Sequence, residues 1–405
     1  MPNLSFLSKT QQILCRLLAE SLFNIPFSLE EGMDWRAVFQ ESKEQTVVIP
    51  AFLNYEKLPF DSELKEEIQK AVNQCSFQSI QNYTYHDYLN CLMTENGISY
   101  CVLKGAASAE YYPSVLMRQM GDVDFLVEKE DFDRVAKILR EDGFSSSGEN
   151  HVHHVVFQKG HMDFEIHFDP PGLPIGPMEK TVRQYFSDIL DKSQKMSNDF
   201  ATCMIPGAFH HGLIMLLHMK GHLFSEGIGL RHLCDWAVFA NALSDREFRE
   251  MFQMRLKEIG LWKFAQTITL ASHFALGISW KPWMGKDQKL AKALLLDIFT
   301  GGNFGVKSKQ RSYEGFFISN RGKNGIRHTT LVQAFLSVNE VVYGHWPIAK
   351  KLKILLPFGW CFFTLRWIVR MILGKRKRVN LLSVYENGSQ RRKLYRQLKL
   401  FVKEK

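Results

Sequence analysis

A chain of 405 residues, 45% of them hydrophobic, has enough apolar side chains for about two or three folded domains, which excludes a disordered or fibrous protein. The net charge of +9 is unevenly placed, because residues 350–405 hold sixteen Lys and Arg against two Glu; that segment is at +14 and residues 1–349 are at −5. The chain ahead of that segment lacks the basic excess of a nucleic-acid-binding face, so nucleic acid is not expected as a partner.

The seven cysteines show no Cys-x-x-Cys spacing, so we expect reduced, buried thiols and a cytoplasmic protein. The N-terminus, MPNLSFLSKTQQILCRLL, lacks a basic start followed by a clean apolar stretch and a cleavage site. We therefore expect no signal peptide.

Residues 1–98 are predicted to form a helical region. Its longest helix is expected to begin at Asp61 or Ser62, which precede Glu66 in a capping pattern, and to end at Gly97, because glycine is a common stop signal. We expect this helix to pack against the sheet of the next region.

Residues 99–177 are predicted to form an α/β core. An apolar strand at 100–103 leads into a turn at Lys104 and Gly105, and a short helix follows. A glycine turn that opens a helix can offer backbone N–H groups to an anion.

The second strand of this region, GDVDFLV, carries two carboxylates. Asp122 and Asp124 point to one face because strand side chains alternate, while Val123, Phe125 and Val127 point into a core. Paired carboxylates repel each other and are costly to desolvate, and a divalent cation removes that cost. The pattern favours a metal site beside a phosphate site; the alternative is a chance Asp-x-Asp on an exposed edge.

A hairpin is predicted from strands at 151–158 and 162–169. The second strand, MDFEIHFD, alternates strictly, so one face is apolar and the other carries Asp163, Glu165, His167 and Asp169. The Pro- and Gly-rich run at 170–177 predicts a linker.

The string LKG…YYP…R…GDVDFLV resembles the nucleotidyltransferase superfamily that includes polymerase β, and more specifically a bacterial subgroup of nucleotidyltransferase family proteins. The resemblance implies an α+β fold, in which a small mixed sheet is flanked by N-terminal and C-terminal helical regions. It implies transfer of a nucleoside monophosphate (NMP) from a nucleoside triphosphate (NTP) to a hydroxyl-type acceptor, with Mg²⁺ as cofactor and Mn²⁺ as an accepted substitute. Asp122, Asp124 and Glu165 would hold the metal, and His167 beside them would contact the nucleotide; alternatively, His167 is a satisfied core histidine.

The chain departs from the superfamily pattern at the phosphate turn, where Gly105 is followed by Ala106 and not by Ser or Gly. Lys104 can supply a positive charge in place of the missing hydroxyl, so Lys104 and Gly105 are expected to hold the β- and γ-phosphates. Arg118, in a longer insert than usual, would neutralise the leaving pyrophosphate. The alternative is that Arg118 pairs with Asp122.

Residues 178–300 are predicted to form a helical domain. Here His211, His218 and His222 are spaced by seven and four, which places them on one helical face. His211 is expected in a polar helix–helix interface, whereas His218 and His222 are candidate nucleotide contacts. Zinc is not expected, because an HEXXH pattern is absent.

The following helix has Arg231 and Asp235 four residues apart. A similar His…His…Arg…Asp pattern occurs in the resembled subgroup and extends the resemblance over about residues 80–240. Asp235 is therefore a candidate nucleotide contact, and the alternative is an ordinary ion pair with Arg231.

The end of the chain divides into a long polar loop at 301–328 and a C-terminal helical region with a basic tail at 329–405. The apolar stretch at 353–378 is interrupted by Arg366 and Arg370, so it is not expected to span a membrane. It would either lie on the inner face of a membrane, with the basic tail, or pack into the core and be followed by a solvated basic tail.

Together these features predict a Mg²⁺-dependent nucleotidyltransferase. The alternative is a non-catalytic nucleotide-binding or interaction protein, peripheral to the membrane. The acceptor stays open among a small molecule, a saccharide and a protein.

Overall fold

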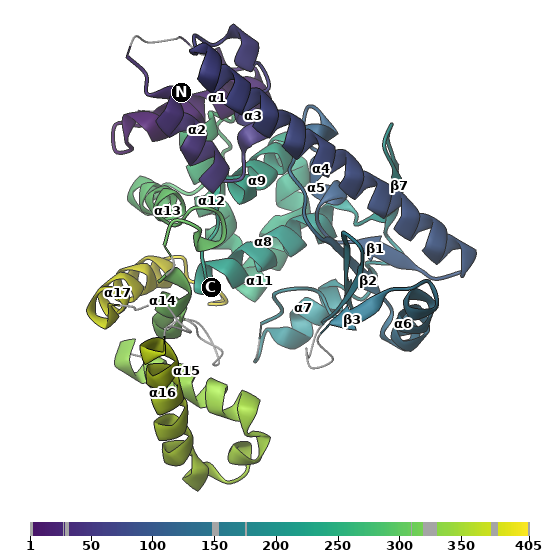
Figure 1. The fold of residues 1–405 in the computed structure, drawn as a ribbon, viewed down its shortest axis with the longest axis vertical. Helices are drawn as coiled ribbons and strands as arrows, with labels where there is room; N and C mark the ends of the chain where they lie inside the picture. Colours follow the sequence, from purple (N-terminus) through teal and green to yellow (C-terminus); the bar gives the residue numbers. More distant parts are fainter. Residues whose placement is uncertain are drawn as a thin grey trace.

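The computed structural model describes residues 3–26, 28, 32–147, 154–174, 176–308, 310–318, 330–373 and 380–403. It has an α+β fold, in which one mixed sheet of five strands lies beside a large assembly of helices (Figure 1). The expected fold class is confirmed.

The N-terminal region is helical, as its sequence predicts. Its helices are α1 (Lys9–Phe23), α2 (Trp35–Glu44), α3 (Val48–Phe52) and α4 (Ser62–Glu95), with a 3₁₀ turn at Tyr55–Lys57. The Asp61 carboxylate caps α4 by accepting a hydrogen bond from the Leu64 N–H at 2.7 Å, and Gly97 follows the helix with a positive φ of 61°. The expected start and stop of this helix are therefore confirmed.

The main sheet has the strand order β1-β2-β5-β4-β3. Its strands are β1 (Tyr100–Val102), β2 (Val123–Val127), β3 (Ser145–Ser147), β4 (His154–Lys159) and β5 (Met162–His167). Strands β2 and β5 are parallel, and the other neighbouring pairs of the described strands are antiparallel. The expected hairpin is present as β4 and β5, although residues 151–153 lie outside the described part of the chain.

The two faces of the sheet have different surroundings because side chains alternate along each strand. Phe125 and Phe164 point into a core that contains Leu89 and Met93 of α4. Leu126, on the opposite face, belongs to the core of the helical assembly. The face that carries Leu126 is therefore turned toward the large helical assembly, whereas α4 covers the opposite face. The Leu126 face also carries the polar residues described below.

Short elements complete the α/β region. They are α5 (Ala106–Ala109), a 3₁₀ turn at Val115–Met117, a 3₁₀ turn at Lys129–Asp131, α6 (Phe132–Glu141) and α7 (Glu179–Tyr185). A small hairpin of β6 (Gln194–Ser197) and β7 (Thr202–Ile205) interrupts the segment predicted to be helical from residue 178 onward.

The helical domain lies on the side of the sheet that carries Leu126 (Figure 1). Its helices are α8 (Ala208–Phe224), α9 (Leu230–Ala242), α10 (Asp245–Phe248), a π-helix at Arg249–Gln253, α11 (Met254–Ile259), α12 (Trp262–Leu276) and α13 (Gln288–Gly301). Helices α8, α9 and α12 are almost entirely buried, which explains their near-continuous apolar sequences.

The segment expected to be a long loop at 301–328 contains a 3₁₀ turn at Asn303–Gly305 and the helix α14 (Arg311–Ile318). Residues 309 and 319–329 lie outside the described part of the chain. Beyond them are α15 (Thr330–His345), 3₁₀ turns at Pro347–Lys350 and Lys353–Leu355, α16 (Leu356–Ile372) and α17 (Leu381–Gln397).

The C-terminal helix α17 is docked on the protein, which corrects the expectation of a solvated basic tail. Arg391 is 5% exposed and donates hydrogen bonds to the Glu314 carboxylate at 2.9 Å and to the Leu223 carbonyl at 3.0 Å. Tyr395 is fully buried, and the Phe401 N–H donates to the Gly260 carbonyl. Two arginines of this segment, Arg391 and Arg392, are therefore buried in the fold. The basic run at 374–379 lies outside the described residues.

Helices α15 and α16 form a hairpin that extends away from the rest of the protein (Figure 1, bottom). They approach closely at Gly359, where a side chain would meet Val342 at 2.6 Å, and the Trp360 indole N–H donates to the Asn339 side chain. No helix in the described part of the chain is both long enough and apolar enough to cross a bilayer.

Candidate active site

The acidic residues of the site come from the two parallel strands at the centre of the sheet. Asp124 of β2 and Glu165 of β5 are register partners, so their side chains lie next to each other on the face turned toward the helices. Asp122 is more exposed, directly before β2. All three line one cavity, as the alternation of both strands predicts.

Lys104 joins this acidic group to the helical domain. It follows β1 at a turn in which Gly105 has a φ of 62°, a backbone conformation that favours glycine. The Lys104 Nζ lies 2.9 Å from the Asp124 Oδ1 and 3.2 Å from the His218 Nε2. The ammonium therefore occupies a position between the carboxylates and α8.

His167 bridges the two carboxylates from the end of β5. Its Nε2 lies 3.1 Å from the Asp124 Oδ1 and 3.1 Å from the Glu165 Oε1. Burial lowers the pKa of His167, but the hydrogen bonds to Asp124 and Glu165 outweigh it, so the pKa is raised above its usual value. His167 is therefore a hydrogen-bonding partner of both carboxylates, which favour its protonated form.

The pKa values of the two aspartates are moved in opposite directions. Burial raises the pKa of Asp124, but Lys104 and His167 outweigh burial and hold it well below its usual range. The charge of Asp124, followed by burial, raises the pKa of Asp122. The site thus holds one firmly ionised carboxylate and a second whose negative charge is unfavourable, which is the condition that a bound cation relieves.

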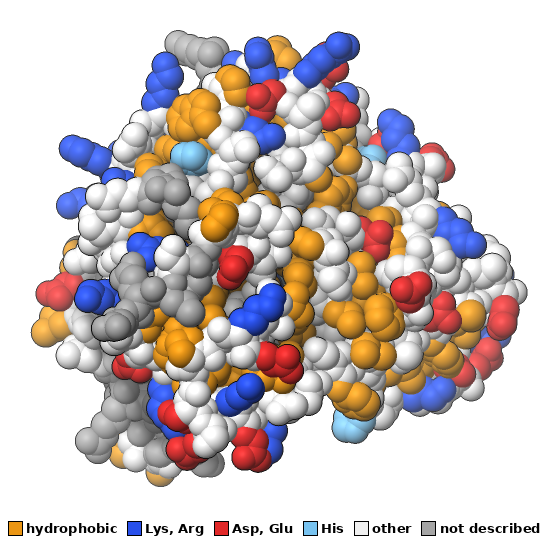
Figure 2. Space-filling model, turned by 90° about the horizontal axis from the view of Figure 1, so that it is seen from above, with side chains coloured by type: hydrophobic (Ala, Val, Ile, Leu, Met, Phe, Trp, Pro, Cys, Tyr) orange, Lys and Arg blue, Asp and Glu red, His pale blue; other side chains and the backbone are white. Residues whose placement is uncertain are grey.

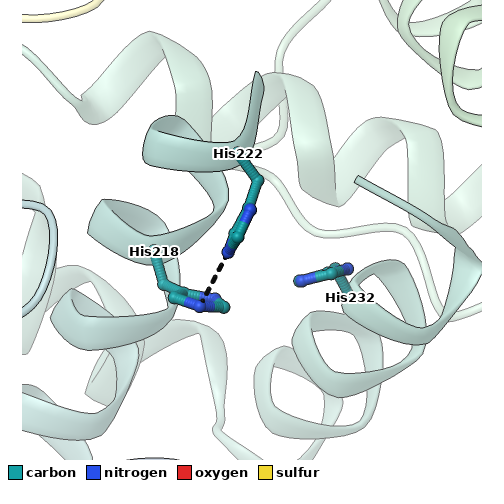
Figure 3. A group of neighbouring side chains, drawn as sticks. All are labelled: His218, His222 and His232. Atoms are coloured by element: carbon teal, nitrogen blue, oxygen red, sulfur yellow. Dashed lines mark hydrogen bonds between the residues drawn. The ribbon is translucent and has the colours of Figure 1, made fainter. Parts of the chain in front are cut away.

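Three histidines form the opposite wall of the cavity. His218 and His222 lie one turn apart on α8, and His232 of α9 faces them (Figure 3). The Nε2 atoms of His218 and His222 are 2.9 Å apart, and the rings of His218 and His232 have centroids 5.7 Å apart. Sequence reasoning missed His232, because its position opposite the other two depends on how α9 packs against α8.

His211, two turns before His218 on α8, is not part of this group. Its ring stacks on Tyr111 at 5.5 Å and its Nε2 lies 3.4 Å from the Ser108 hydroxyl. It belongs to a helix–helix interface, as its sequence position predicts.

Arg118 and Asp235 form a buried ion pair at the back of the cavity. The Arg118 Nε and Nη2 donate to the two carboxylate oxygens of Asp235, each at 3.0 Å, and the Tyr112 hydroxyl donates to the same carboxylate at 2.8 Å. The carboxylate partner of Arg118 is therefore Asp235 and not Asp122. Asp235 is not paired with Arg231, whose Nη1 donates to the Gln119 carbonyl.

The cavity has a volume of about 520 Å³ and lies between the sheet and the helices. The Pro- and Gly-rich linker closes one side: Gly172 has a φ of 77°, and a side chain there would meet the Leu217 carbonyl at 2.5 Å. Phe304 lies on the histidine side, with its ring 4.6 Å from that of His222. Carboxylates and basic groups thus face each other across one enclosed space.

The donor set of the acidic group fits a divalent cation. One ligand atom each of Asp124, Glu165 and His167 lies within 4.8 Å of the others, and Asp122 adds a carboxylate at the same cavity. Carboxylate oxygens suit Mg²⁺, and the mixed oxygen and nitrogen set is also compatible with Mn²⁺. In this structure the Lys104 ammonium balances part of the negative charge that a cation would otherwise balance.

The sequence profile of one protein family, described as uncharacterised nucleotidyltransferase, matches residues 31–276, which is more than half of the chain. The match begins near α2 and ends at the last residue of α12, so it includes the sheet, the acidic group and the three histidines. No curated protein matches the chain. The chain belongs to this family of uncharacterised nucleotidyltransferases.

Proposed function

We propose that the protein transfers an NMP from an NTP to a hydroxyl-type acceptor and depends on Mg²⁺, with Mn²⁺ as a substitute. The observation that supports this is the single cavity in which Asp122, Asp124 and Glu165 face Lys104 and the histidines. A bound complex of metal ion and triphosphate would match this distribution of charge. Its cation would lie against the carboxylates, and its phosphate oxygens would lie against the basic groups.

In the proposed reaction, the acceptor oxygen forms a bond to the α-phosphorus. The bond from the α-phosphorus to the oxygen bridging it to the β-phosphorus breaks, and pyrophosphate leaves with that oxygen. The proton of the acceptor hydroxyl goes to a carboxylate. Glu165 suits this role, because its side chain is 21% exposed in the cavity, whereas Asp124 is buried.

Asp122, Asp124 and Glu165 would hold the metal, which supplies charge neutralisation at the attacking and leaving oxygens. Lys104 is then released from Asp124 to the β- and γ-phosphates, together with the Gly105 turn. His167 keeps the two carboxylates oriented through its hydrogen bonds to both. His218 and His222 would line the opposite wall of the nucleotide site.

Arg118 and Asp235 contribute by fixing the wall of the nucleotide site. The Nε and Nη2 of Arg118 both donate to the Asp235 carboxylate, so this ion pair would fix the shape of the cavity wall. It would also place the positive charge of Arg118 near the leaving pyrophosphate. Direct contact between Arg118 and a phosphate would use Nη1, which donates a long hydrogen bond of 3.5 Å to the Gln119 carbonyl.

A thermal-shift assay with a non-hydrolysable NTP, with and without Mg²⁺, tests the proposal. We expect stabilisation only when both are present, and its loss in Asp122→Asn. Release of pyrophosphate from NTP in the presence of candidate acceptors then tests transfer. Nucleotide stabilisation that is independent of Mg²⁺ would refute the metal-dependent reaction and favour the alternative of a non-catalytic nucleotide-binding protein; no stabilisation by any NTP would favour an interaction protein.

The acceptor is a small molecule, a saccharide or a protein, and a nucleic acid is not expected. Figure 2 shows Lys and Arg side chains scattered among Asp and Glu side chains on the face that it draws, so that face lacks a field of one sign. A nucleic-acid backbone would need such a field.

A second proposal concerns the α15–α16 hairpin, which we propose contacts an anionic membrane surface. Apolar side chains at helical spacing along one side of it are between 43% and 76% exposed. They are Ile354, Phe358, Phe362, Leu365, Val369 and Ile372, here named the apolar stripe. An exposed stripe of this size is unusual for a protein surface that meets only water.

The charge of the hairpin supports a lipid partner. Residues 330–373 contain five Lys or Arg against one Glu, and three of the lysines, Lys350, Lys351 and Lys353, are exposed at the turn between the helices. Trp360, by contrast, packs on α15 through Phe335 and Asn339. The hairpin therefore has a packed inner side and an exposed apolar and basic outer side, which is typical of an interfacial helix.

A further inference from the structure

The cluster of His218, His222 and His232 is separate from the acidic group and has a different chemistry. One ring nitrogen of each lies within 4.8 Å of the others. In Figure 3 the three rings converge on one point between α8 and α9. All three line the cavity, so that point can be reached from the same space as the carboxylates.

The nitrogens of this cluster have few hydrogen-bond partners. The Nε2 of His232, a residue only 6% exposed, finds none among the described residues. The Nδ1 of His222 is on the far side of its ring from His218 and lies 3.8 Å from the Glu226 carboxylate. The Nε2 atoms of His218 and His222 face each other at 2.9 Å, and only one proton can lie between them. A buried polar atom without a partner is costly, which calls for a ligand at this point.

The pKa values of two of these histidines favour the neutral ring. Burial, followed by the charge of Lys104, lowers the pKa of His218 well below its usual value, and burial followed by Arg231 does the same for His232. Neutral imidazole is the form that binds transition metals. Phe304 adds an apolar cover: it has a left-handed φ of 51°, and its ring lies 5.3 Å from that of His232.

We propose that His218, His222 and His232 bind a first-row transition metal ion of the Zn²⁺ class through their ring nitrogens. A fourth coordination position would be open to the cavity, as in sites with three histidine ligands. Three nitrogen donors select Zn²⁺ and its neighbours against Mg²⁺, so this ion and the ion at the carboxylates would be different.

The geometry requires only small movements. Metal–nitrogen bonds of ~2.0–2.1 Å in a tetrahedral site place ligand nitrogens roughly 3.3 Å apart. His218 and His222 would open slightly from 2.9 Å, and His232 would approach them. Binding through the His232 Nε2 puts its ring proton on Nδ1, which gives up a long contact of 3.4 Å with the Gly229 N–H.

Lys104 gives the proposal a distinctive consequence. Its ammonium lies 3.2 Å from the His218 Nε2 and so competes with a metal for the same lone pair. Removal of this charge should strengthen metal binding. If the histidines were instead a phosphate site, removal of Lys104 would weaken binding at the cluster.

The test is a titration of the full-length protein with Co²⁺, in excess Mg²⁺ to keep the carboxylates occupied. Four-coordinate Co²⁺ absorbs strongly in the visible range, and six-coordinate Co²⁺ does not. We expect one Co²⁺ per chain with the four-coordinate band, displaced by Zn²⁺. His218→Ala, His222→Ala and His232→Ala should each weaken binding by at least about 100-fold, and Lys104→Met should tighten it.

His161→Gln is the matched control, because His161 is an exposed histidine in the turn between β4 and β5; it should leave the titration unchanged. Zn²⁺-induced shifts in the ¹⁵N spectrum of the histidine rings identify the ligands in the wild type and do not depend on the variants folding. A wild-type titration without the band, histidine variants that bind normally, or weaker binding in Lys104→Met would each overturn the proposal. The readouts need no NTP, so failure here is distinct from failure of the nucleotidyl-transfer proposal.

Discussion

Asp124 and Glu165 lie directly opposite each other on neighbouring parallel strands, with His167 hydrogen-bonded to both. Parallel pairing is what joins two distant parts of the chain here, because β2 and β5 are separated by α6 and by the hairpin strand β4. The register of the two strands therefore fixes the spacing of the carboxylates.

Substitution of the two aspartates should separate function from stability. Asp122→Asn and Asp124→Asn should each reduce transfer by about 100-fold or more, because a charge that holds the metal is lost. Asp122→Asn should leave the metal-free protein equally or more stable, since Asp124 repels the Asp122 charge. Asp124→Asn should cost about 3 kcal/mol, because Lys104 and His167 lose their buried partner. Chemical denaturation and a pyrophosphate-release assay measure both effects, and normal turnover in either variant would contradict the metal assignment.

Lys104→Ala should discriminate between nucleotides. If the ammonium contacts the β- and γ-phosphates, the variant should lose affinity for NTP while its affinity for NMP is nearly unchanged. Isothermal titration with both nucleotides in Mg²⁺ provides the comparison. Equal losses for the two would mean that Lys104 serves Asp124 and not the phosphates.

The Arg118–Asp235 pair should behave as one unit. Arg118→Met and Asp235→Leu should each cost about 3–5 kcal/mol, because each leaves a buried charge without its partner. The double variant should lose less stability than the sum of the losses in the two single variants. A double-mutant cycle of unfolding free energies, measured by urea denaturation, gives this coupling energy. Additive losses would show that the two charges have other partners of equal weight.

The features that the sequence could predict are those encoded locally. The cap of α4 at Asp61 needs only its own first turn, and the shared face of Asp122 and Asp124 needs only strand alternation. Glu165 could be assigned as the third acidic residue because its strand also alternates. The family resemblance implies an acidic residue at that position.

The features that the sequence could not predict depend on how helices pack. His232 joins His218 only because α9 crosses α8 at that point, and Arg118 reaches Asp235 across 117 positions of chain. The position of the basic C-terminal segment also depends on helix packing. Its composition indicates a solvated tail, whereas Arg391 has buried carbonyl and carboxylate partners.

Lys220 should make stability depend on pH. Burial lowers the pKa of Lys220 to about 8, and its ammonium lies over the Phe401 ring at 4.9 Å. Between pH 8 and about 10.4 the unfolded chain holds this proton more firmly than the folded chain, so the contribution of Lys220 to stability rises with pH. Lys220→Met should therefore stabilise the protein by up to about 3 kcal/mol at pH 7, and the gain should fade above pH 10. Urea denaturation at several pH values measures this gain in the free energy of unfolding. A gain that stays constant from pH 7 to above pH 10 would show that the charge of Lys220 is not responsible.

The α15–α16 hairpin should bind vesicles that contain anionic lipid, and binding should fall steeply with salt. Each of Lys350, Lys351 and Lys353 should contribute about 1 kcal/mol near such a surface, screened within a Debye length. Phe358→Asp and Leu365→Asp should weaken binding without unfolding the protein, because these side chains are 67% and 62% exposed.

Met254→Asp is the matched control for these variants, since Met254 is 74% exposed on α11, outside the apolar stripe; its sedimentation with vesicles should equal that of the wild type. Deletion of the hairpin should abolish binding but spare nucleotide binding, because no residue of the hairpin lines the cavity. A protein that elutes as a dimer without lipid, and as a monomer after Phe358→Asp, would instead mean that a second copy covers the stripe. Equal sedimentation with neutral and anionic vesicles at all salt concentrations would remove the electrostatic part of the proposal, and no sedimentation would remove the proposal itself.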